Sequence, residues 1–131
     1  MGQANFMALT TQPAILVVDD DPGLTKLLQM ILEPMGYGVN IAHDGQSALA
    51  AMVAQRPDLM ILDLMLPGGG GASFLNHLER STHTQRIPIV VLTGMHDEET
   101  KKKILALGVK AYFKKPYSVE NLLSEVKKIT G

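Results

Sequence analysis

Short apolar runs alternate with longer segments of mixed polarity along this 131-residue chain. The runs are rich in Val, Ile and Leu and end at turn residues, which is typical of strands buried on both faces. The longer segments repeat apolar residues every three or four positions, as a helix with one buried face does. The pattern predicts strands at 15–18, 37–42, 59–62, 89–93 and 111–114, and helices that begin near Pro22, Gly45, Phe74, Asp97 and Ser118.

Alternation of strands and helices with short connections indicates an α/β domain. Such a chain forms a parallel sheet with helices on both faces and right-handed crossovers. The length fits one domain, to which we assign residues 14–131. Residues 1–13 show no hydrophobic period, so we predict a flexible leader there.

Two segments have few apolar side chains that could pack against the rest of the domain. The four glycines at 68–71 follow Pro67 and predict a loose loop. The helix near 97–107 has a thin apolar stripe, formed by Ile104, Leu105 and Leu107. We therefore expect this helix to be the least firmly held.

The composition restricts the classes of partner. Net charge is −1 and there is no Trp, so neither charge nor aromatic content favours direct binding of nucleic acid. The absence of cysteine excludes disulfides and thiolate chemistry. No apolar run approaches the roughly 20 residues of a membrane span, and the N-terminus has no signal pattern. We expect a cytoplasmic protein that does not bind membranes.

Four of the five predicted strands end in polar side chains. The first ends at Asp19 and Asp20, the third at Asp63, the fourth at Thr93 and the fifth at Lys115. Each residue alone has an ordinary interpretation as a helix cap, a turn residue, a strand former or a solvated charge. The carboxyl ends of parallel strands share one edge of a sheet, where α/β proteins bind ligands. Their convergence therefore predicts one site.

Three carboxylates at one edge need a counter-charge. Two like charges about 4 Å apart repel by about 4 kcal/mol at an effective dielectric of about 20. Either one carboxyl group takes a proton or a hard divalent cation lies among them. We predict Mg²⁺, with Mn²⁺ as an alternative. A metal-bound carboxylate beside an ammonium and a hydroxyl group suits phosphoryl transfer, with Asp63 as nucleophile and with Lys115 and Thr93 stabilising the phosphoryl oxygens.

The chain resembles the receiver domains of two-component response regulators over about residues 14–130. Four segments carry the resemblance in family-like order and spacing: Val-Asp-Asp-Asp-Pro at 18–22, Asp-Leu-Met-Leu-Pro-Gly at 63–68 with Gly71, Leu-Thr-Gly at 92–94, and Tyr-Phe-Lys-Lys-Pro at 112–116. The resemblance implies a flavodoxin-like sheet of strand order 2-1-3-4-5. It also makes the bond between Lys115 and Pro116 a candidate cis peptide.

The resemblance implies a role for each site residue. Asp63 matches the phosphoacceptor, charged by a sensor histidine kinase or a phosphotransfer protein. Asp19 and Asp20 match the Mg²⁺-binding acidic pair, completed by Asp63 and the backbone carbonyl of Met65. Lys115 matches the phosphate-binding lysine.

The family's switch pair corresponds to Thr93 and Tyr112. Phosphorylation of Asp63 would draw the Thr93 hydroxyl inward and let the Tyr112 ring follow. The face formed by the fourth helix, fifth strand and fifth helix would then change shape for an output domain or a target protein. Such a domain catalyses only its own phosphorylation and dephosphorylation, and we expect no enzyme beyond that.

Methionine stands two residues after Asp63 and two residues after Thr93, at Met65 and Met95. By resemblance these positions flank the phosphoryl group and control the access of water. A thioether cannot position water, so slow self-dephosphorylation is expected. Two alternatives remain: a metal-dependent phosphatase with an aspartyl nucleophile, and a binding module that works without phosphorylation.

Overall fold

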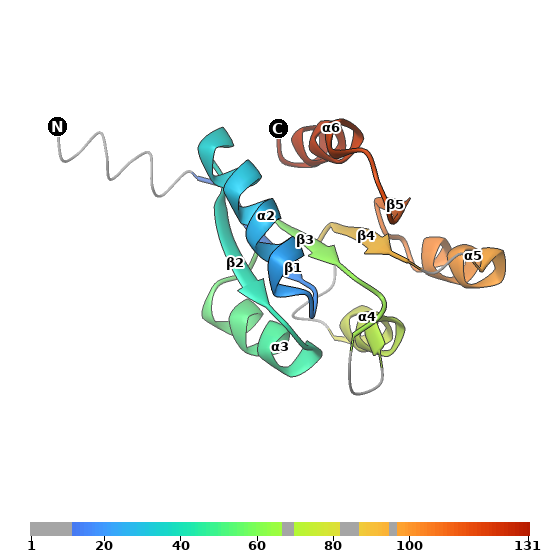
Figure 1. Cartoon of the computed structure of the whole chain (residues 1–131). Helices are drawn as coiled ribbons and strands as arrows, with labels where there is room; N and C mark the ends of the chain where they lie inside the picture. Colours follow the sequence, from blue (N-terminus) through green and yellow to red (C-terminus); the bar gives the residue numbers. More distant parts are fainter. Residues whose placement is uncertain (1–11, 67–69, 82–86, 95–96) are drawn as a thin grey trace, which may run out of the picture.

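The computed structural model describes residues 12–66, 70–81, 87–94 and 97–131. Five parallel strands form one sheet in the order β2-β1-β3-β4-β5 (Figure 1). The strands are β1 (Ala14–Val18), β2 (Gly38–Ala42), β3 (Leu59–Leu62), β4 (Ile89–Thr93) and β5 (Ala111–Lys114). The helices are α2 (Pro22–Leu32), α3 (Gly45–Ala54), α4 (Gly70–Arg80), α5 (Glu98–Ala106) and α6 (Val119–Thr130), and a 3-10 turn follows α2 at Glu33–Met35. The predicted α/β class and strand order are confirmed.

Helices cover both faces of the sheet, and each face has its own apolar core. One core joins side chains of α3, α4 and α5 to alternate residues of the strands. The other joins side chains of α2 and α6 to the intervening residues. Figure 1 shows this arrangement, with α2 and α6 on one side of the sheet and α3 and α4 on the other. Strands β1, β3 and β4 are buried along their whole length, which accounts for their uninterrupted apolar sequences.

Local signals set most of the element boundaries. Asp21 caps α2 through its side chain, which accepts from the backbone N–H groups of Gly23 and Leu24, and Pro22 occupies the first turn. The strand expected at 37–42 begins one residue later, at Gly38. Tyr37 instead points into the core beside α6, and its hydroxyl lies 2.8 Å from the Thr130 hydroxyl.

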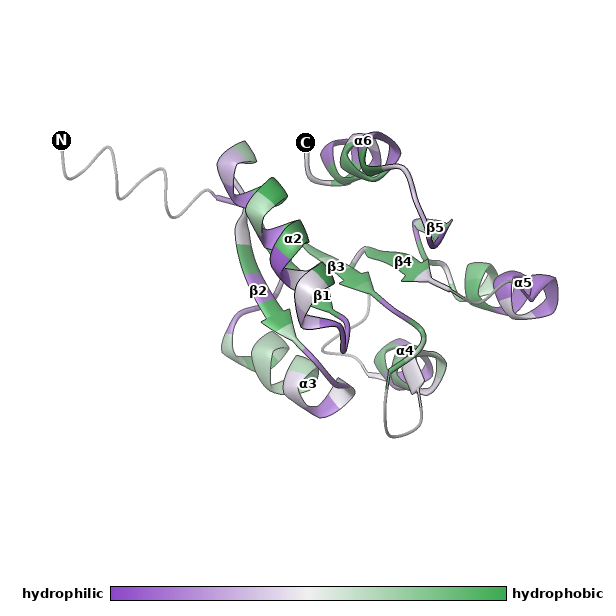
Figure 2. Cartoon of the chain, in the orientation of Figure 1, coloured by the Kyte–Doolittle hydropathy of each residue, from purple (hydrophilic) through white to green (hydrophobic). Residues whose placement is uncertain are grey.

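In α2 and α3, the apolar periodicity of the sequence predicts more buried side chains than the structure contains. Leu27 belongs to the apolar stripe of α2 but is 46% exposed, and Val53 of α3 is 89% exposed. By contrast, α5 buries only Ile104 and is largely hydrophilic in Figure 2. The thin stripe expected for this helix is therefore present in the structure.

The glycine loop predicted at 68–71 does not extend to Gly70 and Gly71. Gly70 and Gly71 begin α4, so a loop across 68–71 is wrong for these two residues, while Gly68 and Gly69 lie outside the described residues. A Cβ atom on Gly71 would lie 2.5 Å from the Asp63 carbonyl oxygen. Glycine at this position lets α4 begin against the backbone that follows β3.

The predicted leader at 1–13 falls almost wholly outside the described residues, which begin at Gln12. Among the helices that the structure describes, none combines the length and the apolar character needed to span a membrane.

Candidate functional site

Asp63 follows β3 directly and is held at the centre of the sheet edge. Its backbone N–H donates to the Val18 carbonyl at 2.9 Å, which extends the pairing of β3 with β1. Its side chain is buried, and Oδ1 accepts from the Met65 N–H at 2.9 Å. The other carboxylate oxygen faces the neighbouring strand ends.

Asp19 and Asp20 stand at the end of β1, next to Asp63. The Asp19 N–H donates to the Ala42 carbonyl at 3.0 Å, and its Oδ1 accepts from the Asp21 N–H at 3.0 Å. Asp19 is buried, whereas Asp20 is exposed. The turn into α2 thus presents one buried and one solvent-facing carboxylate to the same space.

Lys115 reaches both buried carboxylates from the far side of the site. Its Nζ donates to Oδ2 of Asp63 at 2.9 Å and to Oδ2 of Asp19 at 3.0 Å. Its backbone N–H donates to the Thr93 carbonyl at 2.8 Å, which ties the segment after β5 to the end of β4. The bond between Lys115 and Pro116 is cis, as expected. A residue 96 positions from Asp19 is thereby part of the same cluster.

Burial and pairing act on the pKa values of these groups in opposite directions. Burial raises the pKa of Asp19 above 3.8, and this effect outweighs the hydrogen bonds from Asp21 and Lys115 that lower it. Burial also acts to lower the pKa of Lys115, but hydrogen bonds to Asp63 and Asp19 reverse that effect and the pKa is raised. Lys115 is therefore an ammonium group at neutral pH.

The three carboxylates are close enough to share a cation. Asp19, Asp20 and Asp63 each offer an oxygen, and these oxygens lie within 4.8 Å of one another. Oxygen ligands of one Mg²⁺ ion at about 2.1 Å lie roughly 3 to 4 Å apart, so small side-chain movements would complete such a set. Lys115 neutralises only one of the three negative charges. The residues present fit a hard divalent ion.

Thr93 and Tyr112 occupy neighbouring strands beside this cluster. Thr93 ends β4 and is fully buried. Tyr112 of β5 pairs with Val91, two residues before Thr93. Its ring packs against the α3–α4–α5 core, and its hydroxyl is buried without a hydrogen-bond partner among the described residues. The Lys101 Nζ lies 5.8 Å from the centre of the ring.

Met65 is 57% exposed. Its Sδ lies 3.8 Å from where a Cβ atom on Gly94 would be, so its side chain reaches toward the end of β4. Met95, the second predicted methionine of the site, lies outside the described residues.

One residue beside the site escaped the sequence analysis. His43 is exposed, as its sequence surroundings indicate, and its Nδ1 donates to the Asp19 carbonyl at 2.9 Å. This bond adds to the support of the β1 end. His43 directly follows β2, and this position in the sequence could have predicted that it lies at the same edge of the sheet as the site.

Comparison with known proteins agrees with this geometry. The sequence pattern of the family described as the response regulator receiver domain matches residues 15–127. The chain is 37% identical over 115 residues to the phosphate regulon transcriptional regulatory protein PhoB of Escherichia coli, covering 88% of this chain and 50% of PhoB. It is 38% identical over 115 residues to the DNA-binding dual master transcriptional regulator RpaA of Synechocystis, covering 88% and 48%. The chain spans about half the length of these curated relatives.

Solved structures show the same architecture. A response regulator receiver protein from Pseudomonas putida has a TM-score of 0.85 at 29% identity, covering 89% of this chain and 97% of that one. The chemotaxis response regulator CheY4 of Vibrio cholerae has a TM-score of 0.81 at 29% identity, covering 90% and 98%.

Proposed function

This chain belongs to the response regulator receiver domains of two-component systems, and from that premise we propose that it is a switch operated by phosphorylation of Asp63. The supporting observation is the contact of one ammonium group, Lys115 Nζ, with both Asp63 and Asp19 at about hydrogen-bond distance. Such a cluster is suited to receive a group that carries several negative oxygens.

In the proposed step, a carboxylate oxygen of Asp63 attacks the phosphorus of a phosphohistidine on a sensor kinase or phosphotransfer protein. The new bond joins this oxygen to phosphorus, and the bond from phosphorus to the donor nitrogen breaks. The nitrogen keeps the bonding electrons, and because the other ring nitrogen of the phosphohistidine carries a proton, the donor leaves as a neutral imidazole. An acyl phosphate on Asp63 is the product.

The side chains of Asp19, Asp20 and Asp63, with the Met65 carbonyl, would hold Mg²⁺ or Mn²⁺. Bound there, the ion would supply neutralisation of the charge on the phosphoryl oxygens. Lys115 would exchange its bond with Asp63 Oδ2 for one with a phosphoryl oxygen. The Thr93 hydroxyl, at the end of the neighbouring strand, would bind another.

We extend the proposal to a switch through Thr93 and Tyr112. The Tyr112 hydroxyl is buried without a hydrogen-bond partner among the described residues, which costs about 1–3 kcal/mol in its present position. A second position of the Tyr112 ring, in which the hydroxyl has a hydrogen-bond partner, would therefore be close in free energy to the present one. A modest free-energy change at Asp63 would then be enough to favour it. The face formed by α5, β5 and α6 would carry this change to an output domain or a separate target protein.

The relatives set the range of proposed outputs. PhoB and RpaA are named as transcriptional regulators, and the matched region covers about half of each. We propose that this domain itself contacts protein partners, and that any contact with DNA belongs to another domain or another chain.

The central experiment is incubation with acetyl phosphate and Mg²⁺, followed by intact mass spectrometry. One added phosphoryl group is expected on the wild type and none on Asp63→Asn. Asp58→Asn is the matched control, because Asp58 precedes the opposite end of the same strand and should leave phosphorylation unchanged. Equal labelling of Asp63→Asn and wild type would refute the proposal.

The same assay separates the alternatives. Steady release of phosphate from many equivalents of a phosphate ester would indicate a phosphatase. Absence of any labelling, with partner binding unaffected by Asp63→Asn, would indicate a binding module.

Met65 and Met95 lead to a proposal about the lifetime of the acyl phosphate. We expect slow self-dephosphorylation, since a thioether does not orient water. The variant with Met65→Asn and Met95→Asn should lose phosphate several-fold faster. An unchanged rate of phosphate loss would show that these methionines do not control it.

A further inference from the structure

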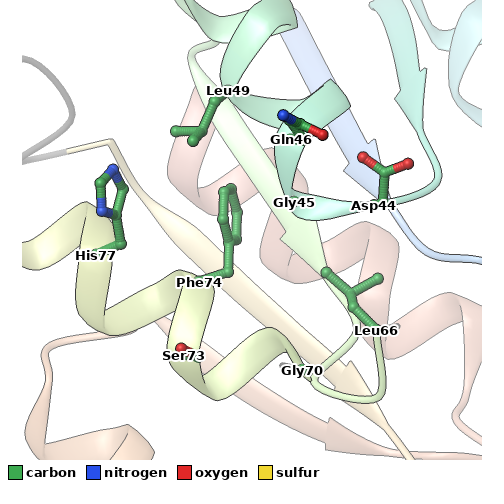
Figure 3. Close-up of a pocket in the computed structure, with 9 residues that line it drawn as sticks. All are labelled: Asp44, Gly45, Gln46, Leu49, Leu66, Gly70, Ser73, Phe74 and His77. Carbon is green, nitrogen blue, oxygen red and sulfur yellow. The ribbon is translucent and has the colours of Figure 1, made fainter. Parts of the chain in front are cut away.

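A cavity of about 350 Å³ lies between α3 and α4, outside the carboxylate cluster (Figure 3). Its nine lining residues come from the start of α3, the segment after β3 and the first two turns of α4. They are Asp44, Gly45, Gln46, Leu49, Leu66, Gly70, Ser73, Phe74 and His77. A volume at the low end of the range for ligand pockets suits a small molecule.

Apolar side chains form the base of this cavity. Phe74 and Leu66 are both buried, and Leu49 is half-buried. Figure 3 shows the Phe74 ring extending from α4 toward α3, with Leu49 on one side and Leu66 on the other. A Cβ atom on Gly45 would lie 3.2 Å from the ring. The absence of a side chain at Gly45 therefore lets α3 begin directly against Phe74.

The charge of the cavity comes from one carboxylate. Asp44 caps α3, and its Oδ1 accepts from the Ser47 N–H at 2.7 Å. The backbone hydrogen bond from Ser47 holds the pKa of Asp44 below 3.8, so the group is ionised at neutral pH. A carboxylate can accept several hydrogen bonds, and capping leaves it able to accept more. None of the nine lining residues is Lys or Arg.

We propose that this cavity binds a small organic cation, a primary amine or guanidinium group joined to a short apolar or aromatic body. The ammonium group would pair with Asp44, and the apolar body would lie on Phe74 and Leu66. Gln46 and Ser73 also line the cavity and supply further hydrogen-bonding groups. The first residues of a helix usually attract anions, and the cavity includes such residues. The Asp44 carboxylate, however, repels an anion from it.

The cavity adjoins the segment that follows the phosphoacceptor. Leu66 and Gly70 line it, and the Gly71 N–H donates to the Leu64 carbonyl at 2.6 Å. A bound cation would thus contact the connection between Asp63 and α4. The binding itself does not depend on the proposed phosphorylation, and each can be tested without the other.

The test is titration of the isotope-labelled full chain with 2-phenylethylammonium chloride, followed by amide chemical shifts. Saturable shifts are expected at residues 44–49 and 70–77. The neutral analogue 2-phenylethanol should bind about fivefold more weakly, and phenylacetate should produce no saturable shift there.

Two variants identify the carboxylate responsible. Asp44→Asn should weaken binding of the amine about fivefold while preserving α3, because Asn caps helices as well as Asp. Asp97→Asn is the matched control: Asp97 caps α5 in the same way but does not line the cavity. A third variant, Ser73→Lys, adds a competing ammonium group at an exposed helix position and should abolish binding.

Three results would each overturn the proposal. The first is the absence of saturable shifts at 44–49 and 70–77. The second is equal affinity for the amine and the alcohol. The third is unchanged affinity in both Asp44→Asn and Ser73→Lys, with melting curves showing that both variants are folded.

Discussion

Strands β3 and β5 both deliver a charged group to the same site, but they differ in burial. All four residues of β3 are buried, and Asp63 follows them at the centre of the sheet. In β5, the edge strand, three residues are half-buried and Lys114 is exposed. Asp63, the proposed phosphoacceptor, thus follows a fully buried strand, whereas Lys115 follows the least buried strand.

The helices beside these strands differ in the same direction. α4, which follows β3, buries Phe74, Leu75 and Leu78, whereas α5 before β5 buries only Ile104. Regions with few buried apolar contacts open at lower free-energy cost. A switch needs a fixed group that receives the signal and a responding segment that can move. In the proposed switch, Asp63 at the buried centre would receive the signal and the exposed edge formed by α5 and β5 would respond.

Truncation of one leucine in each region should give the largest difference in stability. Leu62→Ala removes a fully buried side chain from β3 and should lower the free energy of unfolding by about 3 kcal/mol. Leu105→Ala, on α5 and 43% exposed, should change it by no more than about 0.5 kcal/mol. Urea denaturation followed by circular dichroism measures both. Similar losses would show that the edge is as tightly packed as the centre.

The two adjacent lysines at the end of β5 should differ strongly. Lys115→Met leaves Asp19 and Asp63 buried without their cation, and a loss of about 2 kcal/mol is expected near neutral pH. Millimolar Mg²⁺ should recover part of this loss. Lys114→Met removes only an exposed pair with Glu98 and should cost less than about 1 kcal/mol. Thermal unfolding with and without Mg²⁺ is the measurement; equal losses would contradict the assignment of Lys115.

Asp19 links stability to pH. Its folded-state pKa is raised above 3.8, so the folded protein binds more protons than the unfolded chain between these two values. Stability without metal therefore falls as pH rises through that window, and ionised Asp19 opposes folding at neutral pH. Asp19→Asn should raise the free energy of unfolding by about 1 kcal/mol at pH 7.

The same variant should lose most of the stabilisation that Mg²⁺ gives the wild type. Unfolding curves at several pH values, each with Mg²⁺ and with a chelator, measure both effects. Destabilisation of Asp19→Asn in the presence of the chelator would show that the Lys115 pairing outweighs burial at this carboxyl group.

Two tyrosine hydroxyl groups provide the smallest and most specific contrast. Tyr112→Phe removes a buried hydroxyl that has no partner among the described residues, and should stabilise the protein by about 1 kcal/mol. Tyr37→Phe removes a hydroxyl that pairs with Thr130 and should destabilise it by a similar amount. Effects of the same sign in urea denaturation would show that the Tyr112 hydroxyl is satisfied in solution.

Much of the site could be predicted because its residues stand next to strong local signals. Asp63 ends an uninterrupted apolar run, and Asp19 precedes a capped helix start at Asp21 and Pro22. Such signals depend only on neighbouring residues, so the sequence was sufficient to place these groups at strand ends. The polar edge of the sheet follows from the parallel arrangement.

Local patterns failed where a distant segment decides the outcome. A helical period identifies the apolar face of α3 but not whether another element covers it, and Val53 remains exposed. The glycines at 70 and 71 have the composition of a loop, yet they begin α4. Gly70 adopts a positive φ of 80°, and a Cβ atom on Gly71 would lie 2.5 Å from the Asp63 carbonyl oxygen, so the fold uses glycine at both positions. His43 joins the site only because β2 and β1 lie side by side.

The sequence by itself determined the strands, most helix starts, the α/β class and the kinds of polar group at each strand end. Only the tertiary structure decided that Lys115 contacts Asp19 and Asp63 together, and that a cavity opens beside Asp44 and Phe74. The reason is physical. Periodicity and capping act within a few residues, whereas contacts across 52 or 96 residues depend on how the helices pack the strands against one another.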